Sequence, residues 1–306
     1  MSIRIATGMA ALALAALSAH GQVIDPYYAT NYAAADLGSV PGVPGPYGGI
    51  TFLDSDTLLI GGEANRASGA VYSIDVTRDV DNNITGFVGS ASLFASAPNI
   101  DGGLSFGPGG VLFATGYPVN TLMQIRPGSA APDRTIALTG LGVASSVGTL
   151  AFVPAGFAGA GGMKLASYNA STWYDVTLAA DGLGTYDIAS VGAPITIGGG
   201  PEGIVYIDDS NPLFDADSVL ISEFSLGRVS SYEIDGNGDP VVASRRTFMT
   251  GLSGAEGATL DPVTGQFMFS TFNGGDRVVV VRGFVPAPGS LALLGVAGLV
   301  ISRRRR

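Results

Sequence analysis

The sequence lacks cysteine altogether and contains one histidine, His20, close to its N-terminus. Without cysteine the chain can form neither a disulfide bond nor a thiolate nucleophile. Since His20 falls inside a predicted leader, the mature chain would lack histidine as well. A Ser-His-Asp triad, a zinc site of the usual kind and a haem ligand set are therefore excluded. Any metal that this chain binds should be a hard cation with oxygen ligands, and Ca²⁺ fits best.

Charged residues are also scarce, at 13% of the chain, and the 25 acidic residues outnumber the 15 basic ones. Arg4 and the four C-terminal arginines lie in terminal segments that contain no acidic residue, so the body has 25 acidic against 10 basic residues and a net charge of −15. Such a surface repels the phosphates of nucleic acid and attracts cations. We therefore expect no nucleic-acid partner.

Residues 1–21 have the order of a secretory signal peptide. Arg4 precedes an apolar stretch over 5–17, and the small residues Ala19 and Gly21 frame a cleavage point before Gln22. This order predicts an N-terminal signal helix and export of the protein. A buried N-terminal helix is the alternative.

Residues 285–306 have the features of a second targeting segment. The 19 residues from Phe284 to Ser302 carry no charge, which is just enough to cross a bilayer. We expect a single C-terminal transmembrane helix with the terminal arginines on the cytoplasmic side and the body outside. A Pro-containing motif opens the segment and a basic cluster ends it, formed by Val285, Pro286, Ala287, Pro288, Gly289, Arg303, Arg304, Arg305 and Arg306.

This tail resembles the PEP-CTERM sorting signal of bacterial surface proteins, with Ala287 where that family usually has glutamate. The resemblance implies processing by an exosortase, a membrane protease, and delivery to the cell surface or the extracellular matrix. An extracellular polysaccharide or a surface protein would be the partner there. The helix would hold the chain at the membrane before processing, or permanently if the segment is an ordinary single-span anchor.

Residues 22–284, between the two targeting segments, contain five repeats of short apolar strands. The second positions of the first strands are spaced by 54, 46, 54 and 54 residues and are Ile50, Leu104, Leu150, Ile204 and Ala258. A second and a third strand follow in each repeat, and a weaker fourth strand lies between repeats. Five four-stranded antiparallel sheets of this kind predict an all-β, five-bladed β-propeller. A six-bladed ring with one degenerate blade is the alternative.

The ends of the body are suited to closing such a ring. The fifth repeat runs into the tail after its third strand and so lacks an outer strand, whereas an unpaired candidate strand, 27–37, precedes the first repeat. Pairing residues 27–37 with 277–281 would complete the fifth blade and protect two sheet edges. The body thus resembles the broad group of NHL and SMP-30-like propellers, an architecture that hosts enzymes, lectins and scaffolds alike.

One face of such a propeller collects the loops that enter the first strands and the loops that join the second and third strands. Carboxylates and amides in these loops predict a Ca²⁺ site with ligands from several blades. The candidate ligands are Asp101, Glu202, Glu256, Glu63, Asn169, Glu223 and Asn273, and the same loops also carry the amides Asn65 and Asn120. The resemblance to SMP-30-like lactonases, which bind metal through such groups, implies an enzyme. In the competing interpretation, Glu202 and Glu256 bond neighbouring backbone amides and lock blade to blade.

Two further patterns have competing interpretations. The segment 235–239 begins like a Ca²⁺-binding loop, but Pro240 and Arg246 stand where such a loop needs Gly and Glu, which favours a hairpin turn. A group of aromatic residues could stack on sugars, although aromatic residues in strands mostly belong to the core. This group consists of Trp173, Tyr168, Tyr174, Tyr117 and Phe272.

The sequence as a whole favours an exported, non-catalytic interaction or structural protein at the cell surface or in the extracellular matrix, with Ca²⁺ as a stabilising ion. The alternatives are a Ca²⁺-dependent hydrolase of the lactonase or phosphoesterase kind and a polysaccharide-binding module. No catalytic residue and no cofactor other than Ca²⁺ is predicted.

Overall fold

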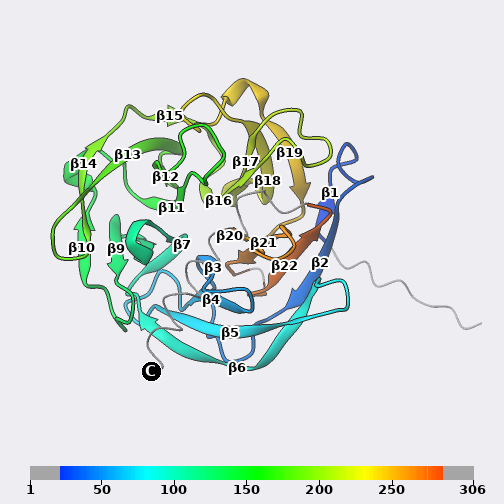
Figure 1. The fold of residues 1–306 in the computed structure, drawn as a ribbon, viewed down its shortest axis with the longest axis horizontal. Coiled ribbons are helices and arrows are strands. Elements are labelled where there is room, and N and C mark those ends of the chain that lie inside the picture. The colour runs from blue at the N-terminus through cyan, green and yellow to red at the C-terminus, as the bar shows by residue number, and fades with distance from the viewer. Residues whose placement is uncertain (1–20, 274, 285–306) are drawn as a thin grey trace, which may run out of the picture.

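The computed structural model describes residues 21–273 and 275–284, which form a ring of five antiparallel sheets around a central axis (Figure 1). This ring confirms the predicted all-β, five-bladed propeller. The predicted signal peptide, apart from residue 21, and the whole of the predicted sorting segment, 285–306, lie outside the described residues. Within the described part of the chain, no helix has the length and hydrophobicity that crossing a membrane requires.

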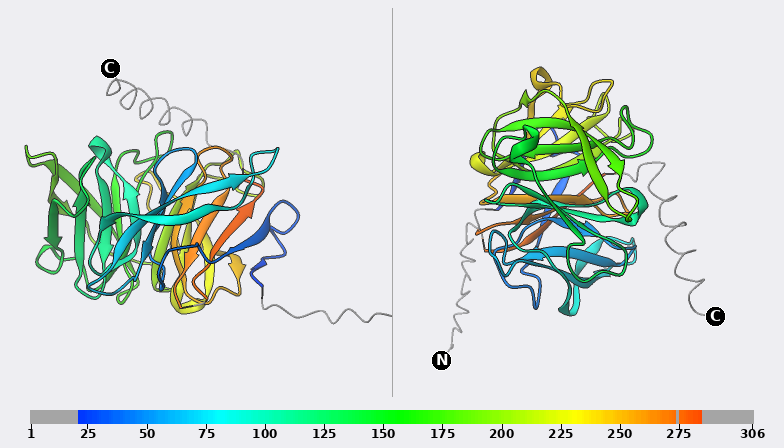
Figure 2. Two further views of the ribbon diagram at one scale, coloured as in Figure 1. Left: turned by 90° about the horizontal axis from the view of Figure 1, so that it is seen from below. Right: turned by 90° about the vertical axis from the view of Figure 1, so that its left-hand side faces the viewer.

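Each blade runs from an innermost strand at the axis to an outer strand at the rim, and its strands cross the ring from one face to the other (Figures 1 and 2). Blade one contains β3 (Ile50–Phe52), β4 (Thr57–Gly62), β5 (Ala70–Arg78) and β6 (Ile84–Ser96). Blade two contains β7 (Ile100–Phe106), β8 (Leu112–Gly116), β9 (Thr121–Ile125) and β10 (Arg134–Ala137). Blade three contains β11 (Val147–Phe152), β12 (Met163–Ser167), β13 (Thr172–Ala180) and β14 (Tyr186–Val191), with the short β15 (Ile195–Thr196) also paired to β13.

Blades four and five complete the ring. Blade four contains β16 (Pro201–Ile207), β17 (Ser218–Glu223), β18 (Arg228–Glu233) and β19 (Arg246–Thr250), and blade five contains β20 (Ala255–Leu260), β21 (Phe267–Thr271) and β22 (Val278–Arg282). Four single-turn 3₁₀ helices lie in the connections: η1 (Pro108–Gly110), η2 (Thr139–Leu141), η3 (Phe224–Leu226) and η4 (Val242–Ser244).

The N-terminal part of the body closes the ring at two places. The strand β2 (Ala33–Gly38) pairs antiparallel with β22, with Ala35 opposite Val280, and so supplies the fourth strand of blade five. This pairing confirms the predicted closure, although the strand begins at residue 33 rather than 27. The sequence analysis missed β1 (Val23–Ile24), which pairs with β19 as a fifth strand at the outer edge of blade four. The N-terminal segment therefore holds blades four and five together.

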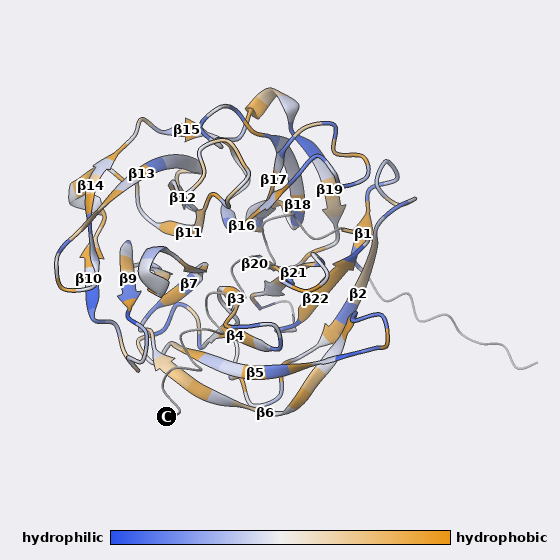
Figure 3. Cartoon of the chain, in the orientation of Figure 1, coloured by the Kyte–Doolittle hydropathy of each residue, from blue (hydrophilic) through white to orange (hydrophobic). Residues whose placement is uncertain are grey.

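Apolar side chains fill the spaces between adjacent blades. Five clusters of buried hydrophobic residues lie one at each junction; in blade one, for example, Leu58 packs towards Val280 of blade five, whereas the next residue, Leu59, packs towards Leu112 of blade two. Hydrophobic residues accordingly recur along the strands of every blade (Figure 3). Because both faces of the sheets are covered, their strands need few charged residues, which explains the low charged fraction of the chain.

Candidate functional site

Three acidic side chains from three blades meet at the central axis. Asp101, Glu202 and Glu256 are each the second residue of an innermost strand, in β7, β16 and β20 respectively. One carboxylate oxygen of each lies within 4.8 Å of those of the other two. The residues are 2%, 3% and 1% exposed, respectively. These three predicted ligands therefore form one buried cluster, the central acid cluster.

Local irregularities in the strands accompany these acids. The strand register shifts at the start of all three strands: between Ile100 and Leu104 in β7, between Pro201 and Gly203 in β16, and between Ala255 and Ala258 in β20. A bulge interrupts the alternation of side chains between the two faces of a sheet and re-aims a side chain. The bulges thus explain how residues inside regular blades present carboxylates to the axis.

Glycines in the neighbouring innermost strands provide the space that the carboxylates need. A Cβ atom on Gly148 would lie 2.5 Å from Oε2 of Glu202, and one on Gly102 would lie 2.1 Å from the carbonyl oxygen of Glu202. Gly148 and Glu202 stand at equivalent positions of the repeats, two residues before the central apolar residue of the first strand. Blade three thus contributes space at the position where blade four contributes Glu202, and blade two contributes both Asp101 and the space beside it at Gly102.

Burial dominates the electrostatics of the cluster. It raises the pKa of Asp101 to about 8, although hydrogen bonds with Glu256, Asn65 and the backbone N–H of Gly102 oppose the increase. The pKa values of Glu202 and Glu256 lie well above the ordinary value, first because of burial and then because of the neighbouring carboxylates. In the absence of a cation the cluster therefore retains protons at neutral pH.

Several oxygens of the site have no hydrogen-bond partner among the described residues. They are Oδ2 of Asp101, Oε2 of Glu202, Oε1 of Glu256 and Oδ1 of Asn65. Buried polar atoms without partners are costly, and carboxylate and amide oxygens are the ligands that Ca²⁺ prefers. These donors are oxygens only, so they fit a hard cation such as the Ca²⁺ expected from the sequence.

A cavity of about 290 Å³ adjoins the central acid cluster. The three acids and Asn65 line it together with four aromatic residues, each of which directly follows the second strand of its blade in blades two to five: Tyr117, Tyr168, Phe224 and Phe272. Successive ring centroids in this series are 5.9, 5.6 and 6.0 Å apart. We call these four residues the aromatic arc. The sequence analysis missed Phe224, although its position after the second strand matches that of the other three.

Glu223 was wrongly grouped with the ligands. Its carboxylate is fully buried and accepts hydrogen bonds from Nε of Arg228, 2.7 Å away, and from the hydroxyl of Tyr232, also 2.7 Å away. Arg245 pairs with the same carboxylate at 2.5 Å. Burial alone would raise the pKa of Glu223, but the hydrogen bonds from the two arginines outweigh burial and hold this pKa below its ordinary value. Glu223 is thus a structural ion-pair partner.

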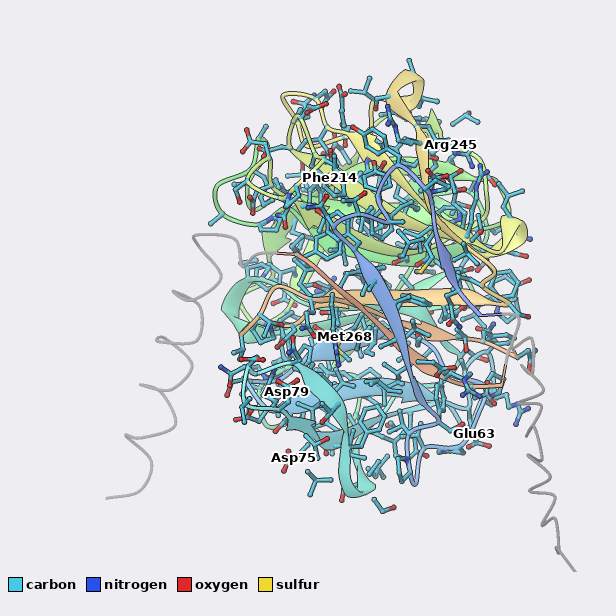
Figure 4. The ribbon with its side chains drawn as sticks, turned by 90° about the vertical axis from the view of Figure 1, so that its right-hand side faces the viewer. Glu63, Asp75, Asp79, Phe214, Arg245 and Met268 are labelled. Carbon is cyan, nitrogen blue, oxygen red and sulfur yellow. The ribbon has the colours of Figure 1, made fainter. Side chains whose placement is uncertain are left out.

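The remaining predicted ligands also lie outside the central acid cluster. Glu63 is partly exposed, 3.8 Å from the guanidinium of Arg66, and lies at the opposite face of the ring from Asp79 (Figure 4). Asn169 accepts a hydrogen bond from the backbone N–H of Ser146 at 2.9 Å, and Asn273 is exposed. In their place Asn65, next to the predicted Glu63 in the same loop, lines the cavity.

The predicted aromatic group divides in two. Trp173 and Tyr174 are 0% and 2% exposed and belong to the core, whereas Tyr117, Tyr168 and Phe272 line the cavity. The segment 235–239 is a turn, as expected: the N–H of Gly238 bonds the carbonyl of Asp235, and Asp239 accepts hydrogen bonds from Lys164 and Trp173.

Comparison with known proteins gives a likeness of fold. No protein-family model and no curated protein matches the sequence. Similar solved structures include a PQQ-bound aldose sugar dehydrogenase from Streptomyces coelicolor, 14% identical, with 80% of this chain and 83% of that chain covered and a TM-score of 0.42. A protein assigned as a gluconolactonase is 16% identical, with 83% and 82% covered and a TM-score of 0.43. A protein assigned as a 6-phosphogluconolactonase from Bacteroides uniformis is 13% identical, with 78% and 67% covered and a TM-score of 0.42.

The predicted non-catalytic role requires correction. In this chain each central acid has one buried carboxylate oxygen without a hydrogen-bond partner among the described residues, beside a cavity, whereas a role in locking blade to blade requires those oxygens to be hydrogen-bonded. The hydrolase alternative fits this site better.

Proposed function

We propose that this propeller is a Ca²⁺-dependent hydrolase of a small molecule, of the lactonase or phosphoesterase kind. One observation carries the proposal: three buried carboxylates from three blades lie within 4.8 Å of one another beside a cavity, and each has an oxygen without a hydrogen-bond partner among the described residues. Ca²⁺ takes about 6–8 oxygen ligands. The three acids and Asn65 supply only part of that number, so water or substrate from the cavity would supply the rest. A site that keeps positions open is typical of catalytic metal centres.

The residues of the site have distinct roles in this proposal. Asp101, Glu202 and Glu256 would hold the cation, which when bound would polarise the oxygen of a substrate carbonyl or phosphoryl group. Asn65 orients Asp101 through its hydrogen bond. Burial excludes bulk water, which strengthens every electrostatic interaction at the reacting group.

The test combines calcium binding with turnover. Calorimetric titration of the mature body should show Ca²⁺ binding, and the double variant Glu202→Gln, Glu256→Gln should weaken it at least about 100-fold because the ligand charge falls. Hydrolysis of δ-valerolactone, 4-nitrophenyl acetate or 4-nitrophenyl phosphate should depend on Ca²⁺ and disappear in the same variant. Glu233→Gln, at an exposed position of β18, is the matched control. Calcium binding without turnover of any of these substrates would contradict the proposal.

The cellular location is a further proposal, supported by the sequence alone. The basic, apolar and small-residue order of 1–21 and the tail 285–306 support export, processing by an exosortase and a final place at the cell surface or in the matrix, beside a polysaccharide or surface protein. Mass spectrometry of the native protein should find Gln22 at the N-terminus and a C-terminus shortened within 285–306. A chain that still ends at Arg306 would instead indicate a permanent anchor.

A further inference from the structure

We infer that the cavity selects an uncharged ester or lactone with a flat apolar ring, and that it rejects phosphoesters. The inference rests on the proposed function for the reaction itself. The recognition of the ligand stands on the lining of the cavity and can be measured without turnover.

The charges around the cavity disfavour an anionic ligand. Its described lining includes three acidic residues and no lysine, arginine or histidine. With all three carboxylates ionised, a single Ca²⁺ would leave the site with one negative charge. A phosphomonoester would add about two more in a poorly hydrated cavity, where such an anion needs paired cations. No basic side chain of the lining is available to supply them.

The basic residues of the neighbouring loops are already paired. Arg228 and Arg245 both bind Glu223 in blade four, and the guanidinium of Arg66 in blade one lies against Glu63. Recruiting one of them to a phosphate would leave a carboxylate without its partner, and for Glu223 that carboxylate is fully buried. The charge balance therefore favours a neutral ligand.

The aromatic arc indicates what the neutral ligand carries. Neighbouring rings around the arc meet edge to face. The interplanar angle is 86° between Tyr117 and Tyr168, 90° between Tyr168 and Phe224, and 69° between Phe224 and Phe272. All four side chains are half-buried, so they retain accessible surface towards the cavity. Alternating rings of this kind can contact an apolar ring by face and by edge.

Blade one interrupts the arc with polar residues. At the position where the other blades have an aromatic residue, blade one has Glu63, and Asn65 lines the cavity from the same loop. The lining of the cavity is thus aromatic in the loops of blades two to five and polar at Asn65 and the central acid cluster. A ligand with a carbonyl group at one end and an apolar ring at the other matches both kinds of lining. At about 290 Å³ the cavity lies at the lower end of small-molecule sites, which suits one or two rings and not a polysaccharide chain.

Two pairs of probes test recognition and charge separately. Dihydroquinolinone and δ-valerolactam are non-hydrolysable lactams that differ in the fused aromatic ring, and their dissociation constants are measured by calorimetry in the presence of Ca²⁺. The double variant Tyr168→Ala, Phe224→Ala should weaken dihydroquinolinone binding at least about tenfold more than valerolactam binding. Tyr168→Phe, Phe224→Tyr should restore it. Tyr27→Ala, at an exposed aromatic residue outside the arc, is the control.

For charge, 4-nitrophenyl acetate and 4-nitrophenyl phosphate share a leaving group. We expect the phosphate to compete poorly with the acetate, with an inhibition constant at least about 100-fold above the KM of the acetate, because two unpaired negative charges disfavour its binding. Faster phosphate hydrolysis, or an equal loss of both lactams in the alanine double variant with Ca²⁺ affinity intact, would overturn the inference. Binding of dihydroquinolinone that depends on the aromatic arc, without hydrolysis of any ester, would overturn the proposed function and leave the recognition inference standing.

Discussion

Glu202 and Glu223 are two buried glutamates of blade four with opposite surroundings. Glu223 is bonded by two arginines and a tyrosine, so its carboxylate is ionised and satisfied within the protein. Glu202 has neighbouring carboxylates in place of arginines, and its Oε2 has no partner in the described chain. A buried glutamate thus stabilises the fold at position 223, whereas at position 202 its charge must be neutralised by a cation or a proton.

The raised pKa values of the central acid cluster predict an unusual pH dependence. In the ion-free protein the folded state retains protons that the unfolded chain loses above about pH 4, so the free energy of unfolding should fall as the pH rises towards about 8. Ca²⁺ competes with those protons, so its apparent affinity should rise over the same range and its binding should release protons.

Thermal unfolding in EDTA and in saturating Ca²⁺ at several pH values checks this prediction. The gap between the two melting temperatures should widen as the pH rises from about 5 to about 8. The variant Glu202→Gln, Glu256→Gln should show little gap at any pH. Glu223 does not cause such a dependence. Because its pKa is lowered, its contribution to the free energy of unfolding is lost only at acidic pH. A gap that stays constant with pH would show that the acids do not exchange protons for the cation.

At the residue scale, the sequence indicated that loop carboxylates and amides were candidate cation ligands. It did not indicate which of these residues lie together at the axis. Glu202 and Glu256 stand at equivalent positions of their first strands and Asp101 one residue earlier in its own, so the three converge because the starts of these strands meet at the axis and a register shift accommodates Asp101. The carboxylate of Glu223 is paired in part by Arg245, which follows 22 residues later in the sequence. The pairing of β18 with β19 brings Arg245 to this position. Such a contact leaves no local sequence pattern.

The loop between β18 and β19 shows how one element is fixed by another. Lys164 of β12 is 1% exposed, and its ammonium donates to Asp239 at 2.6 Å and to the carbonyl of Asn237 at 2.9 Å. It also pairs with Asp175 of β13. A Cβ atom on Gly159 would lie 1.9 Å from that same carbonyl of Asn237, so blades three and four meet closely here. In the apparent Ca²⁺-binding loop, the carboxylate of Asp239 is thus directed to a lysine and a tryptophan, whereas that of Asp235 accepts hydrogen bonds from backbone N–H groups of its own turn.

We predict that Asp239→Asn destabilises the protein without affecting calcium. Removing one carboxylate from a buried ion pair costs about 3–5 kcal/mol in general, and Asp175 should reduce the loss to about 3 kcal/mol by keeping part of the pairing. Guanidinium unfolding measures the loss, and calorimetry should find the Ca²⁺ stoichiometry unchanged. Asp81→Asn, in an exposed turn of blade one, serves as the control. A lost calcium site in Asp239→Asn would mean that the loop binds the ion after all.

Strands could be predicted from the sequence where their pattern of apolar residues was long enough to be recognised. The even spacing of the first strands predicted five blades, because each repeat must supply one complete sheet. The two-residue strand β1 was missed, since its pairing with β19 depends on the turn of 25–32 and on the burial of Tyr28 and Tyr32 against Phe248. A strand of that length has no periodicity of its own.

The whole ring depends on contacts between residues that are far apart in the sequence. Each of the five hydrophobic clusters joins two neighbouring blades, so opening the ring at any junction exposes apolar surface on two sheets. Four junctions connect consecutive repeats. The fifth brings blade one against blade five, and it holds only if β2 remains paired with β22.

A disulfide bond across that pairing should stabilise the entire propeller. Ala35 and Val280 are direct partners in the antiparallel pair β2–β22, and because the chain has no cysteine, Ala35→Cys, Val280→Cys would create a single defined bridge. The bridge would close nearly the whole chain of the body into one loop, for which the chain-entropy argument gives up to about 5 kcal/mol. Oxidised and reduced forms of the same variant provide the comparison, so the substitutions themselves cancel. A higher unfolding midpoint in the oxidised form is the expected result. Two thiols that fail to join under oxidising conditions would show that β2 does not close the ring at this register.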